Sequence, residues 1–288
     1  MRALVTGANG FVGSALLRAA AAAGIEATGI TRRETDYTPR SIASLVEASR
    51  ADFVFHGAGS ASVAASMQDP AADFASSVDL FARVLEGVRL SSHRPRVIFP
   101  SSAAVYGNAP RQPIGEDTPP APISAYGFHK EMCERLAAEY AACFSVPALA
   151  VRIFSLFGSG QRRLLVWELF RQYRESAEVA LAGTGEEERD YLHVDDCAAL
   201  VWRCAGSVQQ EFAVLNMASG ISVRVADLAR RMGSVLSSAK TVSCRGRRSV
   251  GDPVLWRAEV TRLRTLVPGF AAPDLDARLR EVLAAWSQ

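Results

Sequence analysis

Short apolar runs alternate with longer amphipathic segments along most of this chain. The short runs have the length of buried strands, and the longer segments carry apolar residues at helical spacing. This alternation predicts βαβ units and a parallel sheet, and therefore an α/β fold. We expect strands at residues 2–6, 27–31, 52–56, 96–100, 148–154 and 179–182. We expect helices at residues 10–23, 41–49, 70–91, 125–144, 164–175, 225–236 and 275–286.

The expected elements divide the chain into two portions. Residues 1–155 alternate regularly and predict a doubly wound sheet, whereas residues 156–288 predict a smaller and looser α/β portion with segments that return to the main sheet. The segment 108–124 is rich in proline and polar residues, so we interpret it as a loop.

The composition limits the classes of function. With 49% hydrophobic residues among 288, the chain can bury a sizeable core. A net charge of +2 gives no electrostatic support for binding nucleic acid. No apolar run is long enough to cross a bilayer. We therefore expect neither a nucleic-acid partner nor a membrane.

The cysteines and histidines indicate no metal site. The five cysteines form no Cys-x-x-Cys pair and no secretion signal precedes them, which predicts reduced thiols in the cytoplasm. The four histidines do not cluster with them. Asp195 and Asp196 have no third oxygen ligand nearby in the sequence, so we interpret them as the N-cap and first-turn acids of a helix.

A glycine-rich segment links the first expected strand to the first expected helix. Gly7 permits a tight turn, Gly10 lets the backbone approach a pyrophosphate, and Gly13 allows close helix packing. The alternative is a glycine turn without a ligand, but the order strand, glycines, helix favours a Rossmann-type dinucleotide site. The residues assigned to the cofactor here are Gly7, Asn9, Gly10, Phe11, Val12 and Gly13.

The end of the second expected strand bears on the choice between NAD and NADP. NAD-binding proteins place an acid there, but this chain has Arg32 and Arg33, with the first acid at Glu34. Two guanidiniums suit a 2′-phosphate, although they could equally be solvated surface charges. We expect NADP or NAD, with a weak preference for NADP.

A hydroxyl, a phenol and an ammonium follow the glycine motif. Tyr126 and Lys130 are four residues apart near the start of an expected helix, so they share one face. The ammonium favours the phenolate. Ser102 lies just past the end of a strand, where open α/β sheets bind ligands. Tyr-x-x-x-Lys occurs by chance on many helices, but its place downstream of Ser102 and of the phosphate cradle favours proton transfer coupled to hydride transfer.

These motifs resemble an extended short-chain dehydrogenase/reductase of the nucleotide-sugar epimerase/dehydratase group, over nearly the full chain. The resemblance implies a nucleotide-sugar substrate, Tyr126 as the acid/base, Lys130 as its partner and Ser102 as the hydroxyl that steadies the substrate oxygen. It also implies that Arg189 contacts the substrate diphosphate. Further similar segments are 55–59, 69–78, 152–158, 189–196 and 215–220. Residues that the resemblance assigns to the cofactor are Gly57, Ala58, Gly59, Ser101, Tyr126 and Lys130.

The chain departs from this family at three places. Ser155 stands where the family usually has an asparagine that contacts the diphosphate, which puts the nucleotide-sugar assignment in doubt. Arg248 is a candidate phosphate ligand, but its segment is one residue longer than the family pattern. Ala103 and Ala104 replace the Asp-Glu pair of the 4,6-dehydratase branch. Alanine provides no acid or base for eliminating water.

Three functions remain open at this point. The first is an epimerase that acts through a keto-sugar, and the second is an NADPH-dependent 4-ketoreductase. The third is a catalytically silent NADP-sensing scaffold, which would not need the phenol. By resemblance we also expect a homodimer in which the helices at 70–91 and 125–144 form a four-helix bundle with their two-fold mates. The apolar residues considered for that interface are Phe74, Phe81, Leu85, Met132, Leu136, Tyr140 and Cys143.

Overall fold

The computed structural model describes residues 1–246 and 253–288. Its main feature is a six-stranded sheet in the order β2-β1-β3-β4-β5-β9, in which every neighbouring pair of strands is parallel. The predicted α/β class and parallel sheet are confirmed. The strands are β1 (Arg2–Thr6), β2 (Glu26–Ile30), β3 (Phe53–His56), β4 (Arg96–Ser102), β5 (Ala148–Ile153) and β9 (Phe212–Met217).

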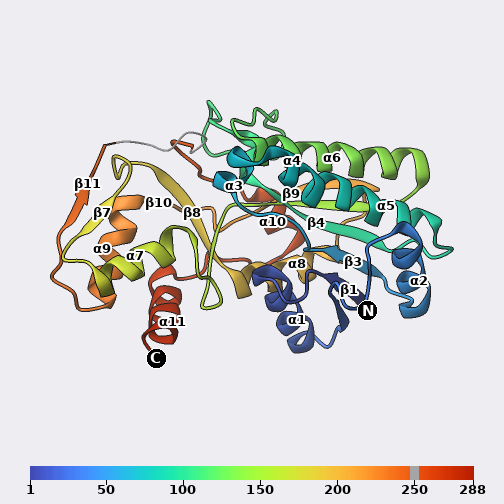
Figure 1. Cartoon of the computed structure of the whole chain (residues 1–288), viewed down its shortest axis with the longest axis horizontal. Helices are drawn as coiled ribbons and strands as arrows, with labels where there is room; N and C mark the ends of the chain where they lie inside the picture. The colour runs from blue at the N-terminus through green and yellow to red at the C-terminus, as the bar shows by residue number, and fades with distance from the viewer. Residues whose placement is uncertain (247–252) are drawn as a thin grey trace.

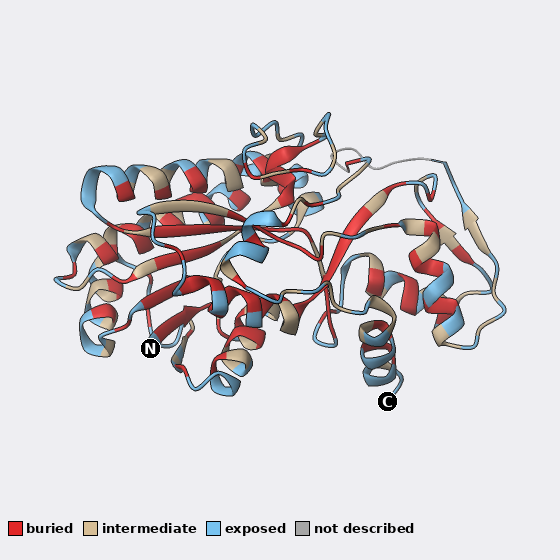
Figure 2. Cartoon of the chain, turned by 180° about the vertical axis from the view of Figure 1, so that it is seen from behind, coloured by how far each residue is buried: buried red, intermediate tan, exposed pale blue. Residues whose placement is uncertain are grey.

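Helices cover both faces of this sheet (Figure 1). On one face lie α1 (Phe11–Ala22) and α8 (Val194–Ala205). On the other face lie α2 (Pro39–Ser49), α5 (Leu80–Leu90) and α6 (Ala125–Phe144). The strands between them are buried over most of their length, as Figure 2 shows in red. Parallel sheets are buried on both sides in this way because crossover helices cover each face.

A smaller portion extends from one end of the main sheet and has its own hydrophobic core (Figure 1). It contains a three-stranded sheet in the order β10-β8-β6 and a two-stranded sheet, β11-β7. Its strands are β6 (Ser155–Phe157), β7 (Val179–Leu181), β8 (Glu188–His193), β10 (Ser222–Arg224) and β11 (Val242–Cys244). Its helices are α7 (Leu164–Glu175), α9 (Val225–Val235) and α11 (Leu275–Ser287), while α10 (Thr261–Leu266) packs near β9.

The chain crosses between the two portions more than once. β6 and β8 belong to the smaller portion, yet α8 packs against α1, and β9 pairs with β5 in the main sheet. The pairing of β9 with β5 runs from Phe212 to Met217. Residues after 155 therefore supply one strand, β9, and two helices, α8 and α10, to the larger body.

The segment expected as one helix at 70–91 contains a π-helical turn. The elements here are α3 (Val63–Gln68), α4 (Pro70–Phe74), the π turn Ala75–Asp79 and α5. A π turn adds a residue to one helical turn and so rotates the helix that follows. Phe74 is consequently 42% exposed, whereas Phe81 is buried. Helical spacing placed Phe74 and Phe81 together among the candidate interface residues, whereas in the structure Phe74 is exposed and Phe81 belongs to the core.

Two expectations drawn from composition can be compared with the structure. Within residues 1–246 and 253–288, no helix is both long and apolar enough to cross a membrane. All five cysteines are free thiols, three of them buried and two exposed.

Candidate active site

The loop between β1 and α1 turns sharply at Gly7. Its φ of +67° lies in the left-handed region, which glycine adopts at little cost. A Cβ on Gly7 would lie 2.5 Å from the carbonyl carbon of Gly57, and a Cβ on Gly13 would lie 2.3 Å from the Gly7 oxygen. Three backbone segments therefore meet at distances that exclude a side chain, and the roles predicted for these glycines have a geometric basis.

Helix α1 begins without a side-chain cap. Gly10 is its N-cap and makes no side-chain hydrogen bond to the first turn. The amide N–H groups of that turn and the positive end of the helix dipole form an anion site that suits a pyrophosphate. A cavity of about 420 Å³ opens beside them. Its wall includes seven of the residues assigned to the cofactor: Gly7, Asn9, Gly10, Arg32, Gly57, Ala58 and Gly59.

Other residues assigned to the cofactor lie away from this wall. Phe11, Val12 and Gly13 form the first turn of α1. Ser101 is buried, and its hydroxyl donates a hydrogen bond to Glu134 Oε1 at 2.5 Å. The geometry therefore gives the Ser101 side chain a protein partner rather than a place in the cavity.

The two arginines and the acid that follow β2 lie in different surroundings. Arg32 lines the cavity, whereas Arg33 is exposed outside its wall. The Glu34 carboxylate accepts hydrogen bonds from the Thr31 hydroxyl at 2.6 Å and from the Thr31 amide at 2.7 Å. These bonds lower the pKa of Glu34. The Arg32 guanidinium therefore borders the cofactor cavity, and the Glu34 carboxylate is held at the end of β2.

Tyr37 borders the same cavity and was not identified from the sequence. It is 5% exposed and has a φ of +59°, which is uncommon for a bulky residue. Burial raises its pKa. Strained backbone of this kind is often found at ligand sites. No local sequence pattern marks a tyrosine for this conformation, so only the folded structure reveals it.

Ser102, Tyr126 and Lys130 lie at the carboxyl end of the main sheet. Ser102 is the last residue of β4, and its Oγ accepts a hydrogen bond from the Ala104 amide at 3.1 Å. Tyr126 and Lys130 are in the first two turns of α6, with Lys130 Nζ 5.5 Å from the centroid of the Tyr126 ring. All three catalytic candidates are partly exposed. Solvent therefore reaches them, although none of the three is in the wall of the cofactor cavity.

Close packing brings the start of α6 to the turn that follows Ser102. A Cβ on Gly127 would lie 2.6 Å from the Ala104 oxygen, so glycine is required for this approach. The Tyr126 amide donates to Ser66 Oγ of α3 at 3.0 Å. Sequence reasoning did not identify Gly127 or Ser66, because their roles come from tertiary contacts alone.

His56, the last residue of β3, is buried near Lys130. Its Nδ1 lies 3.0 Å from Thr6 Oγ1, and its ring stacks on Phe81 with centroids 5.4 Å apart. Burial, together with the positive charge of Lys130, lowers the pKa of His56 to about 3. The imidazole is therefore neutral at physiological pH.

Ser155 and Arg189, two predicted substrate contacts, lie on adjoining strands of the smaller portion. Ser155 of β6 pairs with Tyr191 of β8, two residues beyond Arg189. Arg189 is 7% exposed, and its guanidinium lies 5.5 Å from the centroid of the Trp256 ring. The third predicted contact, Arg248, lies outside the described residues.

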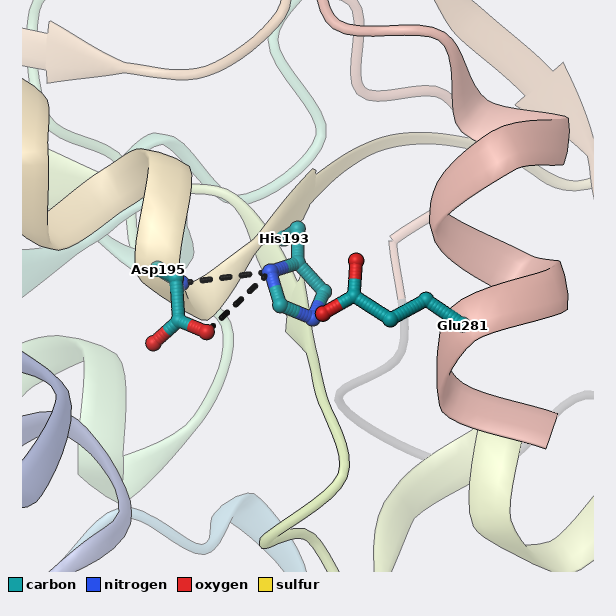
Figure 3. Close-up of side chains that lie close together, drawn as sticks. All are labelled: His193, Asp195 and Glu281. Atoms are coloured by element: carbon teal, nitrogen blue, oxygen red, sulfur yellow. Dashed lines mark hydrogen bonds and ion pairs between the residues drawn. The ribbon is translucent and has the colours of Figure 1, made fainter. Parts of the chain in front are cut away.

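Figure 3 shows a cluster at the start of α8 that the sequence did not predict in full. His193 ends β8, and its Nδ1 accepts a hydrogen bond from the Asp195 amide at 3.3 Å. The N-cap is therefore His193 and not Asp195, while Asp195 and Asp196 occupy the first turn, where the dipole favours acids. Glu281 of α11 completes the cluster, and the potential ligand atoms of His193, Asp195 and Glu281 lie within 4.8 Å of one another.

The two carboxylates of this cluster and Nδ1 of His193 already have protein partners, whereas Nε2 of His193 is buried with no hydrogen-bond partner among the described residues. Arg18 pairs with Asp195 at 2.6 Å, and Arg278 pairs with Glu281 at 2.7 Å. Because Nδ1 of His193 accepts a hydrogen bond, the neutral ring carries its proton on Nε2 and offers no lone pair there. These contacts favour a helix cap within an ion-pair network, and the absence of a metal site stays a prediction.

Comparison with protein-family models matches residues 3–218 to the NAD dependent epimerase/dehydratase family. The chain belongs to this family. The resemblance inferred from the sequence motifs is thereby confirmed, and the protein is an enzyme of the extended short-chain dehydrogenase/reductase type.

Individual members of the family match over almost the whole chain. A UDP-glucose 4-epimerase of Azospirillum brasilense is 29% identical over 98% of this chain and 91% of its own. The solved structure of MoeE5 with UDP-glucuronic acid and NAD is 26% identical, with a TM-score of 0.89 over 100% of this chain and 99% of that one. A UDP-N-acetylglucosamine 4-epimerase from Methanobrevibacter ruminantium M1 is 24% identical and shares the fold, with a TM-score of 0.90 over 99% and 98% of the two chains.

NAD is the cofactor of this family and is present in the MoeE5 structure. The residues of this chain fit NAD for two reasons. The close backbone contacts at Gly7 and Gly13 exclude side chains from the loop, and the first turn of α1 has no side-chain cap. The expectation of NAD or NADP is confirmed for NAD. The weak preference for NADP, which rested on Arg32 and Arg33, stays a prediction.

Proposed function

We propose that this family member is a nucleotide-sugar 4-epimerase that acts on a UDP-hexose. The observation that carries the proposal is the packing of the start of α6, with Tyr126 and Lys130, against the turn after Ser102. This arrangement stands at the carboxyl end of the sheet, as the cofactor cradle does. The full-length similarity to a UDP-glucose 4-epimerase supports carbon 4 and the uridine nucleotide.

Each of the three side chains has a distinct part in the reaction. Ser102 Oγ holds the oxygen of the sugar carbon that is oxidised, and Tyr126 Oη takes the proton from that oxygen and later returns it. Lys130 stabilises the phenolate by its positive charge. When bound, NAD supplies the hydride acceptor and donor. For inversion of the carbon, the site would have to leave the keto-sugar free to turn and present its opposite face.

The two alanines after Ser102 bear on the type of reaction. Ala103 and Ala104 are buried, at 0% and 6% exposure. Elimination of water requires an acid and a base at adjacent carbons, and alanine supplies neither. We therefore assign an interconversion of hydroxyl and ketone without loss of water.

The second candidate function is an NADPH-dependent 4-keto-sugar nucleotide reductase. Arg32 at the wall of the cofactor cavity favours it, because a guanidinium can pair with a 2′-phosphate. A GDP-6-deoxy-D-talose 4-dehydrogenase of Aggregatibacter actinomycetemcomitans is 27% identical over 78% of this chain. An NADP-sensing scaffold is less consistent with the site, since sensing does not require the Tyr126 hydroxyl.

The test begins with the nucleotide that copurifies with the protein. Mass spectrometry should identify bound NAD, and the protein should interconvert UDP-glucose and UDP-galactose, or their N-acetyl counterparts, without added cofactor. A site that takes up NADPH and oxidises it in proportion to a 4-keto-sugar nucleotide would replace the epimerase by the reductase.

Tyr126→Phe should lower turnover by about a hundredfold or more, because a general acid/base contributes roughly this factor. The variant keeps the aromatic ring and the hydrogen bond from the backbone amide of residue 126 to Ser66 Oγ, so folding and NAD binding should persist. Steady-state kinetics and calorimetry measure the two effects. Near-normal turnover would remove Tyr126 from the mechanism.

We also propose a homodimer through a four-helix bundle. The helices concerned leave Phe74, Phe128 and Met132 exposed, at 42%, 48% and 42%. Phe81 and Leu85, which were also considered for the interface, are buried in the core of their own subunit. The proposal therefore rests on the exposed apolar residues of α4 and α6.

A further inference from the structure

The carboxyl ends of β4 and β5 are polar beneath α6, although both strands are apolar before that point. Ser101 and Arg152 are partners in the parallel register, and both are buried, at 1% and 4% exposure. Phe99 lies two residues before Ser101 on β4, and Ala150 lies two residues before Arg152 on β5. Both are apolar side chains of the core under α6, on the same face of their strands as Ser101 and Arg152. A buried hydroxyl and a buried guanidinium need polar partners.

Glu134 of α6 is the partner of both. Its carboxylate accepts hydrogen bonds from Ser101 Oγ at 2.5 Å, from Arg152 Nε at 2.9 Å and from Arg152 Nη2 at 2.6 Å. Glu134 is itself only 5% exposed. A two-pronged contact between a guanidinium and a carboxylate is strong and fixes the relative orientation of the two groups. One side chain thus clamps α6 to the ends of two neighbouring strands.

The clamp lies in register with the catalytic residues. Tyr126, Lys130 and Glu134 follow one another at intervals of four residues, so they share one face of α6. On the strand side, Ser101 directly precedes Ser102. The Glu134 carboxylate therefore connects the strand end that carries the substrate-orienting hydroxyl with the helix that carries the phenol.

Arg152 extends this connection to the loop at 108–124 and to β9. Its Nη1 donates a hydrogen bond to the backbone carbonyl oxygen of Glu116 at 3.2 Å, and its guanidinium lies 4.6 Å from the centroid of the Tyr106 ring. The Tyr106 hydroxyl donates to Asn216 Oδ1 of β9 at 2.7 Å. The clamp is thereby linked to β9 and to the loop before α6.

We propose that Glu134 is a positioning residue that sets the separation between the Ser102 and Tyr126 hydroxyls. The inference rests on the proposed function in one respect, namely that both hydroxyls hold the same substrate oxygen. Glu134 is buried and is not part of the cofactor cavity wall, so it would act through Ser101 and α6. A misplacement of about 1 Å in such a geometry can lower a rate on the order of a hundredfold.

The first test compares Glu134→Gln with Glu139→Gln, which changes an exposed acid on the same helix. In Glu134→Gln, kcat for the UDP-hexose should fall roughly 10- to 100-fold, while KM and the Kd for NAD change by less than about twofold. Glu139→Gln should leave all three unchanged. Unchanged kcat in a folded Glu134→Gln protein would overturn the inference.

A second variant avoids the risk of misfolding. Ser101→Ala removes one hydrogen bond of Glu134 and keeps the ion pair with Arg152, so its melting temperature should stay close to that of the wild type. Its kcat should still fall several-fold, with KM unchanged. A lower affinity for NAD with unaltered kcat would instead show that Ser101 serves the cofactor, and would overturn the proposed role of the clamp.

Hydrogen–deuterium exchange separates this inference from the proposed function. Amides 125–130 should exchange faster in Glu134→Gln than in the wild type or in Glu139→Gln. If the wild type is inactive on every UDP-hexose while this exchange increases, the proposed function fails and the clamp on α6 stands. If the wild type is active and Glu134→Gln changes neither exchange nor kcat, the inference fails and the proposed function stands.

Discussion

At the scale of single residues, His56 is an ionisable side chain that the fold keeps uncharged. It is 4% exposed, and burial together with the charge of Lys130 lowers its pKa from 6.5 to about 3. The unfolded chain therefore takes up a proton near pH 6.5, and the folded chain does so only near pH 3. Between these values the unfolded state binds more protons, so the free energy of unfolding rises with pH.

His56→Gln should flatten this dependence between pH 5 and pH 7. One such group contributes at most about 1.4 kcal/mol per pH unit. Urea denaturation at pH 5, 6 and 7 measures the free energy of unfolding of both proteins. The wild type should lose more stability than the variant as the pH falls from 7 to 5. Parallel pH dependences would contradict the assignment of a neutral, buried imidazole.

Arg32 and Arg33 should differ in their effect on cofactor choice, because Arg32 lines the cavity and Arg33 does not. Arg32→Ala should weaken NADP binding by roughly 1.5–3 kcal/mol, the value of one charged hydrogen bond, and should change NAD binding much less. Arg33→Ala serves as the matched control and should leave both affinities near their starting values. Calorimetry measures all four. Equal losses for NAD and NADP would show that Arg32 does not contact a 2′-phosphate.

At the scale of elements, the packing of α1 onto its own strand–helix turn depends on Gly13. A Cβ there would lie 2.3 Å from the Gly7 oxygen, a backbone atom with no freedom to move aside. Gly13→Ala should therefore displace the start of α1, weaken NAD binding and lower the free energy of unfolding by about 1–3 kcal/mol. Gly206→Ala, where the nearest atom is 3.9 Å away, should do neither. Denaturation and calorimetry would test the pair, and normal NAD affinity in Gly13→Ala would argue against the cradle.

The elements with clear local signals could be predicted closely from the sequence. α6 and α7 have the predicted bounds, 125–144 and 164–175, because each is one uninterrupted helix. β8 was not predicted, and the start of α8 was predicted with its cap at Asp195 instead of His193, since His193 ends the strand and caps the helix without a loop between them. The π turn at Ala75–Asp79 was missed for a related reason, because regular spacing assumes a regular helix.

The same distinction applies to the candidate site. Ser102, Tyr126 and Lys130 follow a recognisable spacing, and the structure places all three at the carboxyl end of the sheet. The roles of Gly127 and Glu134 depend on tertiary contacts. Gly127 packs against Ala104, and Glu134 accepts a hydrogen bond from Ser101. No sequence spacing encodes those contacts, so sequence reasoning could not find them.

At the scale of the whole molecule, exposed apolar side chains gather on α3, α4, α6 and the segment before α6. They include Met67, Phe74, Ile123, Phe128 and Met132, each at least 38% exposed. A contiguous exposed apolar patch on a protein surface often marks an interaction site, whereas single exposed apolar residues are common. A two-fold contact would cover them with one self-complementary patch.

Met132→Glu should therefore convert a dimer into a monomer, because a charge would be buried at the two-fold contact. Tyr140 is a poorer site for this test, since its hydroxyl donates to Glu86 at 3.2 Å within the subunit. Ile221→Glu changes a residue that is 57% exposed in the smaller portion and should not alter the mass. Light scattering at micromolar concentration measures all three proteins. A monomeric wild type would refute the dimer.

The return of β9 to the main sheet also has a consequence for synthesis on the ribosome. β5 emerges at residues 148–153, but its outer neighbour emerges only at residues 212–217. At translation rates of 5–20 residues per second, this strand edge stays unpaired for on the order of ten seconds. Open edges of buried, apolar strands readily pair with other chains. The nascent protein thus passes through a period of exposure to aggregation, in which a chaperone, or a change in the rate of translation between residues 153 and 212, would alter its yield.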